Sequence, residues 1–112
     1  GSAQLGDAGK RELDKLAGVL LDVVKTIPDD LDWILRIDGH TDLIPINTPQ
    51  FPSNWELSTA RAVAVVRYLA NQNVPQNRMV AAGFGEFFPV ADGTTVEALQ
   101  KNRRIEIKLT DR

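Results

Sequence analysis

The single histidine of the chain, His40, lies two residues before Asp42, and the sequence contains no cysteine. A metal site would have to combine these two residues with carboxylates from elsewhere, whereas zinc sites normally draw on more imidazole or thiolate ligands. A serine nucleophile would need Ser53 or Ser58 beside His40, but neither serine stands in the context of a nucleophile elbow. We therefore expect neither an enzyme nor a bound cofactor.

A glycine-containing segment at residues 83–86 (GFGE) resembles part of a phosphate-binding loop. The third glycine and a following helix with Lys or Ser/Thr are missing, and short motifs of this kind are weak signals. A tight turn at the end of a strand is the favoured interpretation.

The composition of the chain excludes several classes of protein. The chain has 112 residues, of which 43% are hydrophobic and 25% charged, as expected for one folded domain spanning residues 1–112. Its net charge of -2 argues against nucleic acid as a partner, because phosphate backbones require clustered Lys and Arg. No apolar run approaches the roughly 20 residues of a membrane helix, so we expect membrane attachment only through parts of a parent protein outside this chain.

The first half of the sequence predicts a helix, a strand and a second helix. Apolar residues at helical spacing predict an amphipathic helix with Asp7 as N-cap, which ends before Pro28. Residues 33–38 predict a strand that ends near Gly39, followed by an ordered loop over residues 40–52. Ser53 and Glu56 have the spacing of a capping box that opens a helix running to about residue 71.

The second half predicts a strand at residues 78–84, turns at residues 85–93, a short helix around residues 95–101 and a strand at residues 104–109. This alternation predicts an α/β fold, a two-layer sandwich, and leaves parallel and mixed strand pairing open. On the second helix, Arg61 lies near Leu57 and Ala64, whereas Arg67 projects from another face.

Four motifs occur in order between residues 39 and 107. They are residues 39–42 (GHTD), 54–61 (NWELSTAR), 83–89 (GFGEFFP) and 102–107 (NRRIEI). Together they resemble the OmpA-like family, with its G-H-T-D strand end, N-x-x-L-S-x-x-R-A helix start, G-[YF]-G-E-x-x-P turn and closing N-R-R-[VI]-E-[IL].

The resemblance implies a βαβαβ-type fold with a mixed sheet and helices on one face, and non-covalent binding of peptidoglycan through the diaminopimelate of the stem peptide. By position, Asp42 matches the acidic ligand of the diaminopimelate amine, and Arg61 the basic ligand of its carboxylate. A fixed carboxylate and a guanidinium fork suit such a zwitterion. Other positions implied to line the pocket are Thr41, Asn54, Leu57 and Arg103.

Details of the loops point to one branch of the family. The loop from Asp42 to Asn54 is longer than in outer-membrane members, and its sequence resembles the flagellar-stator (MotB) branch. The resemblance implies a periplasmic domain that anchors a membrane-bound envelope protein to the cell wall. Residues 97–100 (EALQ) depart from the family's E-[GN]-R-A, so a basic residue is missing there. Gly1 and Ser2 are either a cloning remnant or native; if native, the family's first strand lies upstream and is absent.

Alternatives remain open at the level of sequence. A cell-wall enzyme, or a domain used only for protein contact with Asp42 and Arg61 in a closed salt bridge, are the rival functions, and a homodimer is left open. Asn54 also suits a helix start, His40 the support of a turn, and Arg103 and Arg104 a solvated surface. Finally, Phe51 and Trp55 fit a packing cluster over the loop better than a sugar platform.

Overall fold

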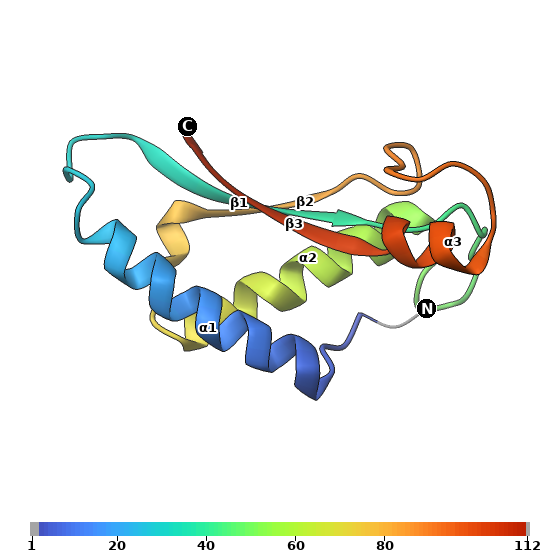
Figure 1. Cartoon of the computed structure of the whole chain (residues 1–112), viewed down its shortest axis with the longest axis horizontal. Coiled ribbons are helices and arrows are strands. Elements are labelled where there is room, and N and C mark those ends of the chain that lie inside the picture. Colours follow the sequence, from blue (N-terminus) through green and yellow to red (C-terminus); the bar gives the residue numbers. More distant parts are fainter. Residues whose placement is uncertain (1–2, 112) are drawn as a thin grey trace.

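The computed structural model describes residues 3–111; Gly1 and Ser2, for which two origins were considered, lie outside them. None of the helices in this part of the chain combines the length and apolar character of a membrane span. The elements follow one another along the chain (Figure 1) as α1 (Asp7–Val24), β1 (Trp33–His40), α2 (Asn54–Asn71), the 3₁₀ turn η1 (Gln76–Arg78), β2 (Met79–Gly83), α3 (Val96–Asn102) and β3 (Arg104–Asp111).

The three strands form one mixed sheet in the order β2-β1-β3. Strand β1 runs parallel to β2 and antiparallel to β3, so that Ile37 lies opposite both Ala81 and Ile107. Helices α1 and α2 lie under the same face of the sheet (Figure 1), and α2 is the crossover between the two parallel strands. The predicted two-layer α/β sandwich is confirmed, and the pairing left open by the sequence is mixed.

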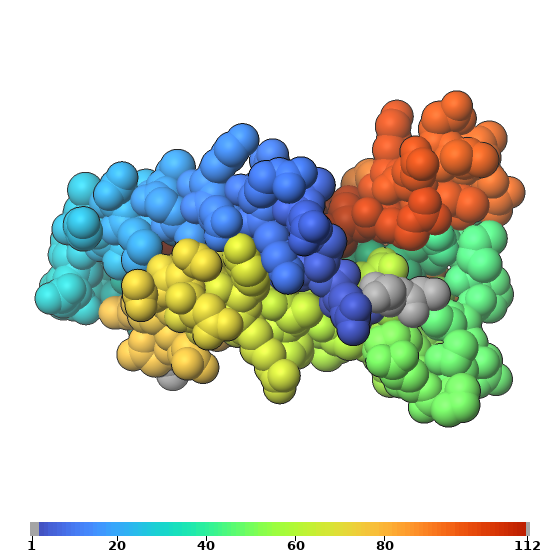
Figure 2. All heavy atoms as spheres, turned by 90° about the horizontal axis from the view of Figure 1, so that it is seen from below, coloured from blue at the N-terminus to red at the C-terminus, as the bar shows by residue number. Residues whose placement is uncertain are grey.

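The core fills the space between the sheet and the two long helices. Alternate residues of β1, namely Trp33, Leu35 and Ile37, are buried as their spacing predicts. Figure 2 shows α1 and α2 side by side on this face of the molecule. The other buried members of the core come from α1, α2 and the segment after α2: Leu13, Ala17, Ala62, Val65, Leu69 and Val74.

Element boundaries differ from the prediction by at most three residues, and one of the two predicted helix caps is wrong. The prediction of Asp7 as N-cap is wrong, because Gly6 precedes the first turn of α1 without a side-chain bond and Asp7 is already helical. Ser53 does cap α2, and its oxygen accepts from the Trp55 N–H at 3.2 Å. The Glu56 carboxylate, however, accepts a bond from the Ser53 hydroxyl at 2.8 Å, so the reciprocal capping box is not formed as expected.

Two glycines allow α2 to lie directly against the carboxyl ends of β1 and β2. A Cβ atom on Gly39 would overlap the backbone carbonyl of Ser58, and one on Gly83 would overlap the Thr59 side chain. Gly39 and Gly83 are register partners in the parallel pair. The loops that leave these two strands are therefore held beside the first turns of α2.

Hydrogen bonds hold the loop after β1 and the loop after β2 in place. The buried Ser58 hydroxyl accepts from the Gly85 N–H at 3.0 Å, and the Gly85 carbonyl accepts from the Thr41 N–H at 2.9 Å. At the end of α3, the buried Asn102 amide bonds to the backbone of Val90 and Ala91 at 2.8–3.1 Å. The loops after β1 and β2, and the start of β3, consequently meet at one end of the molecule.

We predict that Gly39→Ala destabilises the domain by at least about 1–3 kcal/mol, the usual cost of overpacking, because the new methyl group must displace the α2 backbone. The matched control is Gly18→Ala in α1, where nothing lies within 4 Å of the added Cβ. There, better helix propensity should raise stability by up to about 1 kcal/mol. Urea denaturation followed by circular dichroism measures both, and equal effects at the two glycines would disprove the close-packing argument.

Candidate functional site

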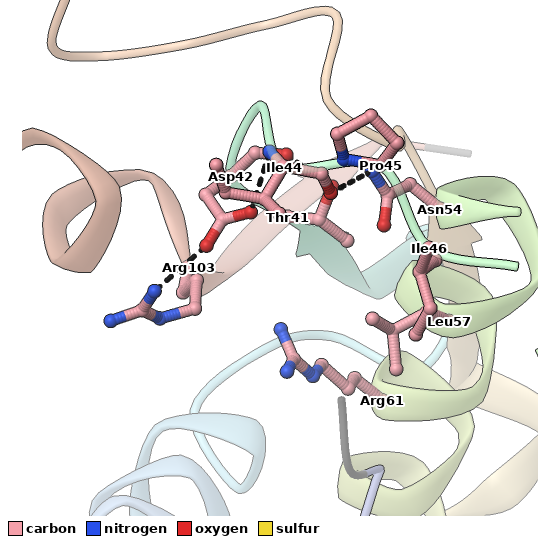
Figure 3. A pocket seen from close by; sticks show the side chains of 9 residues that line it. All are labelled: Thr41, Asp42, Ile44, Pro45, Ile46, Asn54, Leu57, Arg61 and Arg103. Atoms are coloured by element: carbon pink, nitrogen blue, oxygen red, sulfur yellow. Dashed lines mark hydrogen bonds and ion pairs between the residues drawn. The ribbon is translucent and has the colours of Figure 1, made fainter. Parts of the chain in front are cut away.

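A cavity of about 310 Å³ lies where the loop after β1 meets the first turns of α2. It contains all six of the residues singled out from the sequence, together with three apolar residues of the loop that were not predicted as site residues (Figure 3). Those three lie two to four positions after Asp42, and this closeness in sequence was the available signal. The complete lining is Thr41, Asp42, Ile44, Pro45, Ile46, Asn54, Leu57, Arg61 and Arg103.

The Asp42 carboxylate is fixed on both oxygens. One oxygen accepts from the Ile44 N–H at 3.0 Å, and the other accepts from the Arg103 guanidinium at 2.7 Å. The Thr41 hydroxyl donates to the Asp42 carbonyl at 3.0 Å and so holds the backbone of the turn. Asp42 is 8% exposed, and its position is therefore set before any ligand arrives.

Asn54 joins the loop to the helix. It is the first helical residue of α2 rather than its cap, and its buried amide donates to the Ile44 carbonyl at 3.1 Å. The sequence suggested two roles for Asn54, a helix start and a position in the pocket. In the structure Asn54 starts α2 and also lines the cavity. Leu57, one turn further on, is buried and supplies an apolar wall.

Arg61 extends from α2 towards the space below Asp42 and Arg103 (Figure 3). Among residues 3–111, the ion pair of Asp42 is with Arg103, so the structure does not show the closed Asp42–Arg61 salt bridge considered above. Burial lowers the pKa of the Arg61 guanidinium; nearby Asp42 raises it and Arg103 lowers it. A guanidinium nevertheless stays charged in proteins, so Arg61 is a partly desolvated cation for which an anionic group would be a favourable neighbour.

The two arginines before β3 have different partners. Arg103 reaches the cavity, whereas Arg104 donates to the Phe88 carbonyl at 2.9 Å and to the Glu106 carboxylate at 2.6 Å. Neither is only a solvated surface residue. The cavity thus has two guanidinium groups and one carboxylate over an apolar wall, an arrangement that can hold a ligand with both a carboxylate and an amine.

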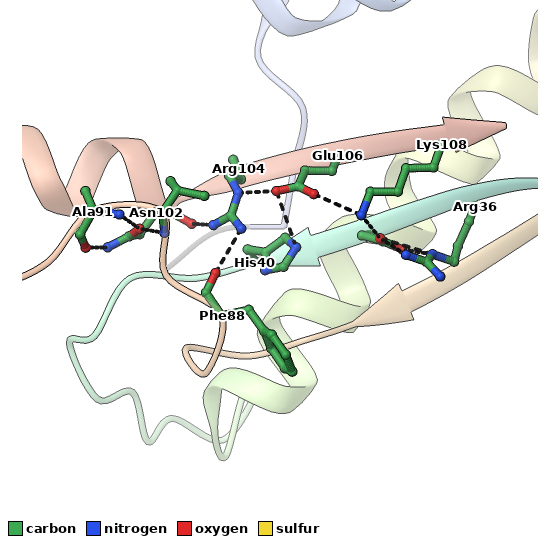
Figure 4. A network of polar contacts seen from close by, with 10 residues as sticks. Arg36, His40, Phe88, Ala91, Asn102, Arg104, Glu106 and Lys108 are labelled. Atoms are coloured by element: carbon green, nitrogen blue, oxygen red, sulfur yellow. Dashed lines mark hydrogen bonds and ion pairs between the residues drawn. The ribbon is translucent and has the colours of Figure 1, made fainter. Parts of the chain in front are cut away.

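His40 lies on the opposite, open face of the sheet, in a polar network (Figure 4). Its metal-binding atoms lie within 4.8 Å of those of Asp38 and Glu106, and Asp42 is not part of this group. Both carboxylates already pair with cations: Asp38 with Arg36 at 2.9 Å, and Glu106 with Arg104 at 2.6 Å. A metal ion would have to displace these cations, so the group fits a structural network better than a metal centre.

The His40 ring is packed rather than poised for proton transfer. It stacks on Phe84 at 4.9 Å, and its Nδ1 has no hydrogen-bond partner among the described residues. Burial, followed by the charge of Arg104, lowers the pKa of His40. The Ser53 and Ser58 hydroxyls donate to Glu56 and to the Trp55 carbonyl. These contacts agree with a supporting role for His40 and provide no serine–histidine pair.

The expected packing cluster of Phe51 and Trp55 is only half right. Phe51 is buried, but Trp55 is 49% exposed and stacks on Phe87, a residue that the sequence had not singled out. The physical reason is that Trp55 lies on the side of α2 that faces Phe87 in the loop after β2.

The sequence matches the OmpA family over residues 1–103. It is 40% identical over 110 residues to the uncharacterized protein YtxE of Bacillus subtilis, covering 94% of this chain and 44% of that protein. It is 36% identical over 86 residues to the peptidoglycan-binding protein ArfA of Mycobacterium tuberculosis, covering 77% of this chain and 24% of that protein.

The fold also matches a solved structure. The crystal structure of a putative MotB-like protein from Desulfovibrio vulgaris superposes with a TM-score of 0.83 at 28% identity, over 99% of this chain and 65% of that one. The chain spans less than half of the length of the two relatives above. The family match over residues 1–103 and the shared fold together show that this chain belongs to the OmpA family.

Proposed function

We propose that this domain binds peptidoglycan non-covalently through the diaminopimelate of the stem peptide. In this way it anchors a larger envelope protein, of the MotB-like stator kind, to the cell wall from the periplasm. The observation that carries the proposal is that Asp42, Arg61 and Arg103 line one cavity beside an apolar wall. The relative named as peptidoglycan-binding, which shares 36% of its matched residues with this chain, supports peptidoglycan in general as the ligand.

Each part of the ligand has a counterpart in the cavity. The diaminopimelate ammonium pairs with Asp42, whose orientation is held by Ile44 and Arg103. The carboxylate at the same end pairs with the Arg61 fork, which matches carboxylate geometry with two parallel bonds. Leu57 packs against the methylene groups, while Thr41 and Asn54 keep the loop in place.

The rival functions receive less support. A domain used only for protein contact was expected to close Asp42 onto Arg61, but the ion pair of Asp42 among the described residues is with Arg103. A cell-wall enzyme needs an activated nucleophile or metal-bound water. The Ser58 hydroxyl and the carboxylates near His40 are engaged in structural bonds. We therefore propose a binding module without catalytic activity.

Sedimentation with purified sacculi tests the function directly. We expect the domain to co-sediment with diaminopimelate-type walls and to bind lysine-type walls at least about tenfold more weakly, since lysine lacks the second carboxylate. No soluble muropeptides should be released. Equal binding to the two wall types would contradict the diaminopimelate site, and release by native but not boiled protein would contradict the absence of catalysis.

Asp42→Asn should abolish binding to sacculi while leaving the domain folded. The amide oxygen can still accept from the Ile44 N–H, but the charge that attracts the ammonium is gone. Circular dichroism checks the fold, and Asp30→Asn, in the exposed turn before β1, is the matched control. Parent-like binding by Asp42→Asn would mean that another group holds the amine.

Arg61→Lys should bind poorly although it keeps the positive charge, because an ammonium cannot form two parallel bonds to a carboxylate. For Arg61→Ala, the loss of one partner of a desolvated ionic contact costs about 2–5 kcal/mol, or roughly thirtyfold or more in affinity. Arg67→Ala is the control, since Arg67 lines a different groove of α2. Calorimetry with a diaminopimelate-containing peptide distinguishes them, and equal affinity of Arg61→Lys and the parent would make Arg61 a structural residue.

A further inference from the structure

Two exposed aromatic residues beside the first turn of α2 take no part in the cavity described above. Trp55 is 49% exposed and Phe87 is 56% exposed, yet their rings stack on each other at 5.0 Å with 28° between the planes. Aromatic side chains usually bury most of their area, and an exposed apolar surface beside polar groups often marks a binding site. The pair forms a surface that we call the aromatic platform.

The backbone beneath the aromatic platform is built to hold it. Gly85 has φ of +64°, and a Cβ atom there would lie 3.3 Å from the Phe87 ring and 3.6 Å from the Trp55 ring. The Gly85 N–H donates to Ser58 and its carbonyl accepts from Thr41. The turn that presents Phe87 to Trp55 is thereby fixed to both α2 and the loop after β1.

Polar groups lie next to the indole. A hollow of about 370 Å³ is lined by Trp55, Glu56, Thr59 and Ala60. The Glu56 carboxylate accepts from the Ser53 hydroxyl at 2.8 Å and has further lone pairs to offer. The Thr59 hydroxyl donates to the Trp55 carbonyl at 2.8 Å, so its oxygen can still accept. The hollow therefore combines an aromatic floor with hydrogen-bond acceptors and one negative charge.

This combination fits a neutral saccharide. A pyranose ring has an apolar C–H face that can lie on an aromatic ring, and hydroxyl groups at its rim that donate to acceptors such as Glu56. An apolar protein segment or an acyl chain would instead leave the carboxylate desolvated without a partner. An anionic ligand would be repelled by the same charge.

We propose that the aromatic platform and the hollow beside it bind the glycan strand of the cell wall, as a second subsite next to the stem-peptide cavity. The identification of the sugar as wall glycan rests on the proposed function. Asn54 and Leu57 line the cavity, whereas Trp55 and Glu56 line the hollow, so one turn of α2 serves both.

The distance between the two subsites suits a single stem peptide. Two amino acids and a lactyl group separate the sugar from diaminopimelate, a span of roughly 10 Å at about 3.5 Å per unit. A helix with its side chains is about 10–12 Å across. Neighbouring residues such as Asn54 and Trp55 project about 100° apart on such a helix, which is a path of roughly 10 Å along its surface, so a stem can reach from the hollow to the cavity.

Titrations with two separate probes test the inference. The probes are glycan strands freed of all stem peptides, with the lactyl carboxylates that this exposes capped as amides so that the strands stay neutral, and a free diaminopimelate-containing stem peptide. Trp55→Ala and Phe87→Ala should each weaken glycan binding about fivefold to tenfold, the effect of one aromatic contact, and leave peptide affinity unchanged. Val19→Ala, which trims another exposed apolar residue on α1, is the matched control and should leave both affinities unchanged.

The outcomes separate the two proposals. Glycan binding that is weakened in Trp55→Ala but unchanged in Asp42→Asn supports the second subsite, even if peptide binding should fail and the proposed cavity with it. Absence of glycan binding by the folded parent overturns the inference while leaving the peptide cavity intact. Unchanged glycan affinity in both aromatic variants overturns the inference as well. If these variants were then retained less than the parent by envelope proteins or lipid vesicles, the aromatic platform would be a docking site for that partner instead.

Discussion

The close approach of α2 to the ends of β1 and β2 determines where every other part of the site lies. Gly39 and Gly83 have no side chains, so the backbone of α2 near Ser58 and Thr59 rests on the strands themselves. Any larger residue would push the helix outwards, because packed interiors leave little free space. The loops after β1 and β2 are then near enough to be fastened through Ser58 and Gly85.

This constraint gives the short motifs of the family a physical meaning in this chain. Gly39 and Gly83 provide room, Ser58 ties the turn after β2 to α2, and Asn102 ties the following loop to the start of β3. Arg103 comes next along the chain and reaches Asp42. Most residues of the motifs therefore assemble the cavity, and few of them are free to touch a ligand.

Charged side chains are paired differently on the open face of the sheet and in the cavity. On the open face, Asp38 and Glu106 are each paired with basic side chains, which balances the charge around the buried His40. In the cavity, one carboxylate faces two guanidinium groups, and Arg61 is partly desolvated. Desolvated charges interact strongly with a ligand because less water screens them. The binding of a zwitterionic ligand that we propose relies on this partly desolvated charge.

The order and type of the elements could be predicted from the sequence alone. The alternation at Trp33, Leu35 and Ile37 and the helical spacing in α1 and α2 are local patterns, and local patterns report which face will be buried. Through its motifs, the sequence also indicated six residues that proved to line one cavity. It did less well at helix starts, where Asp7 was mistaken for the cap that Gly6 provides.

The partners of these residues, in contrast, depend on how distant segments pack together. Arg103 and Asp42 are 61 positions apart, and their pairing depends on β3 lying antiparallel to β1. The separation of His40 from the cavity and the stacking of Trp55 on Phe87 likewise depend on which side of a strand or helix each residue occupies. Contacts between distant segments arise from packing, and spacing along one chain carries no record of them.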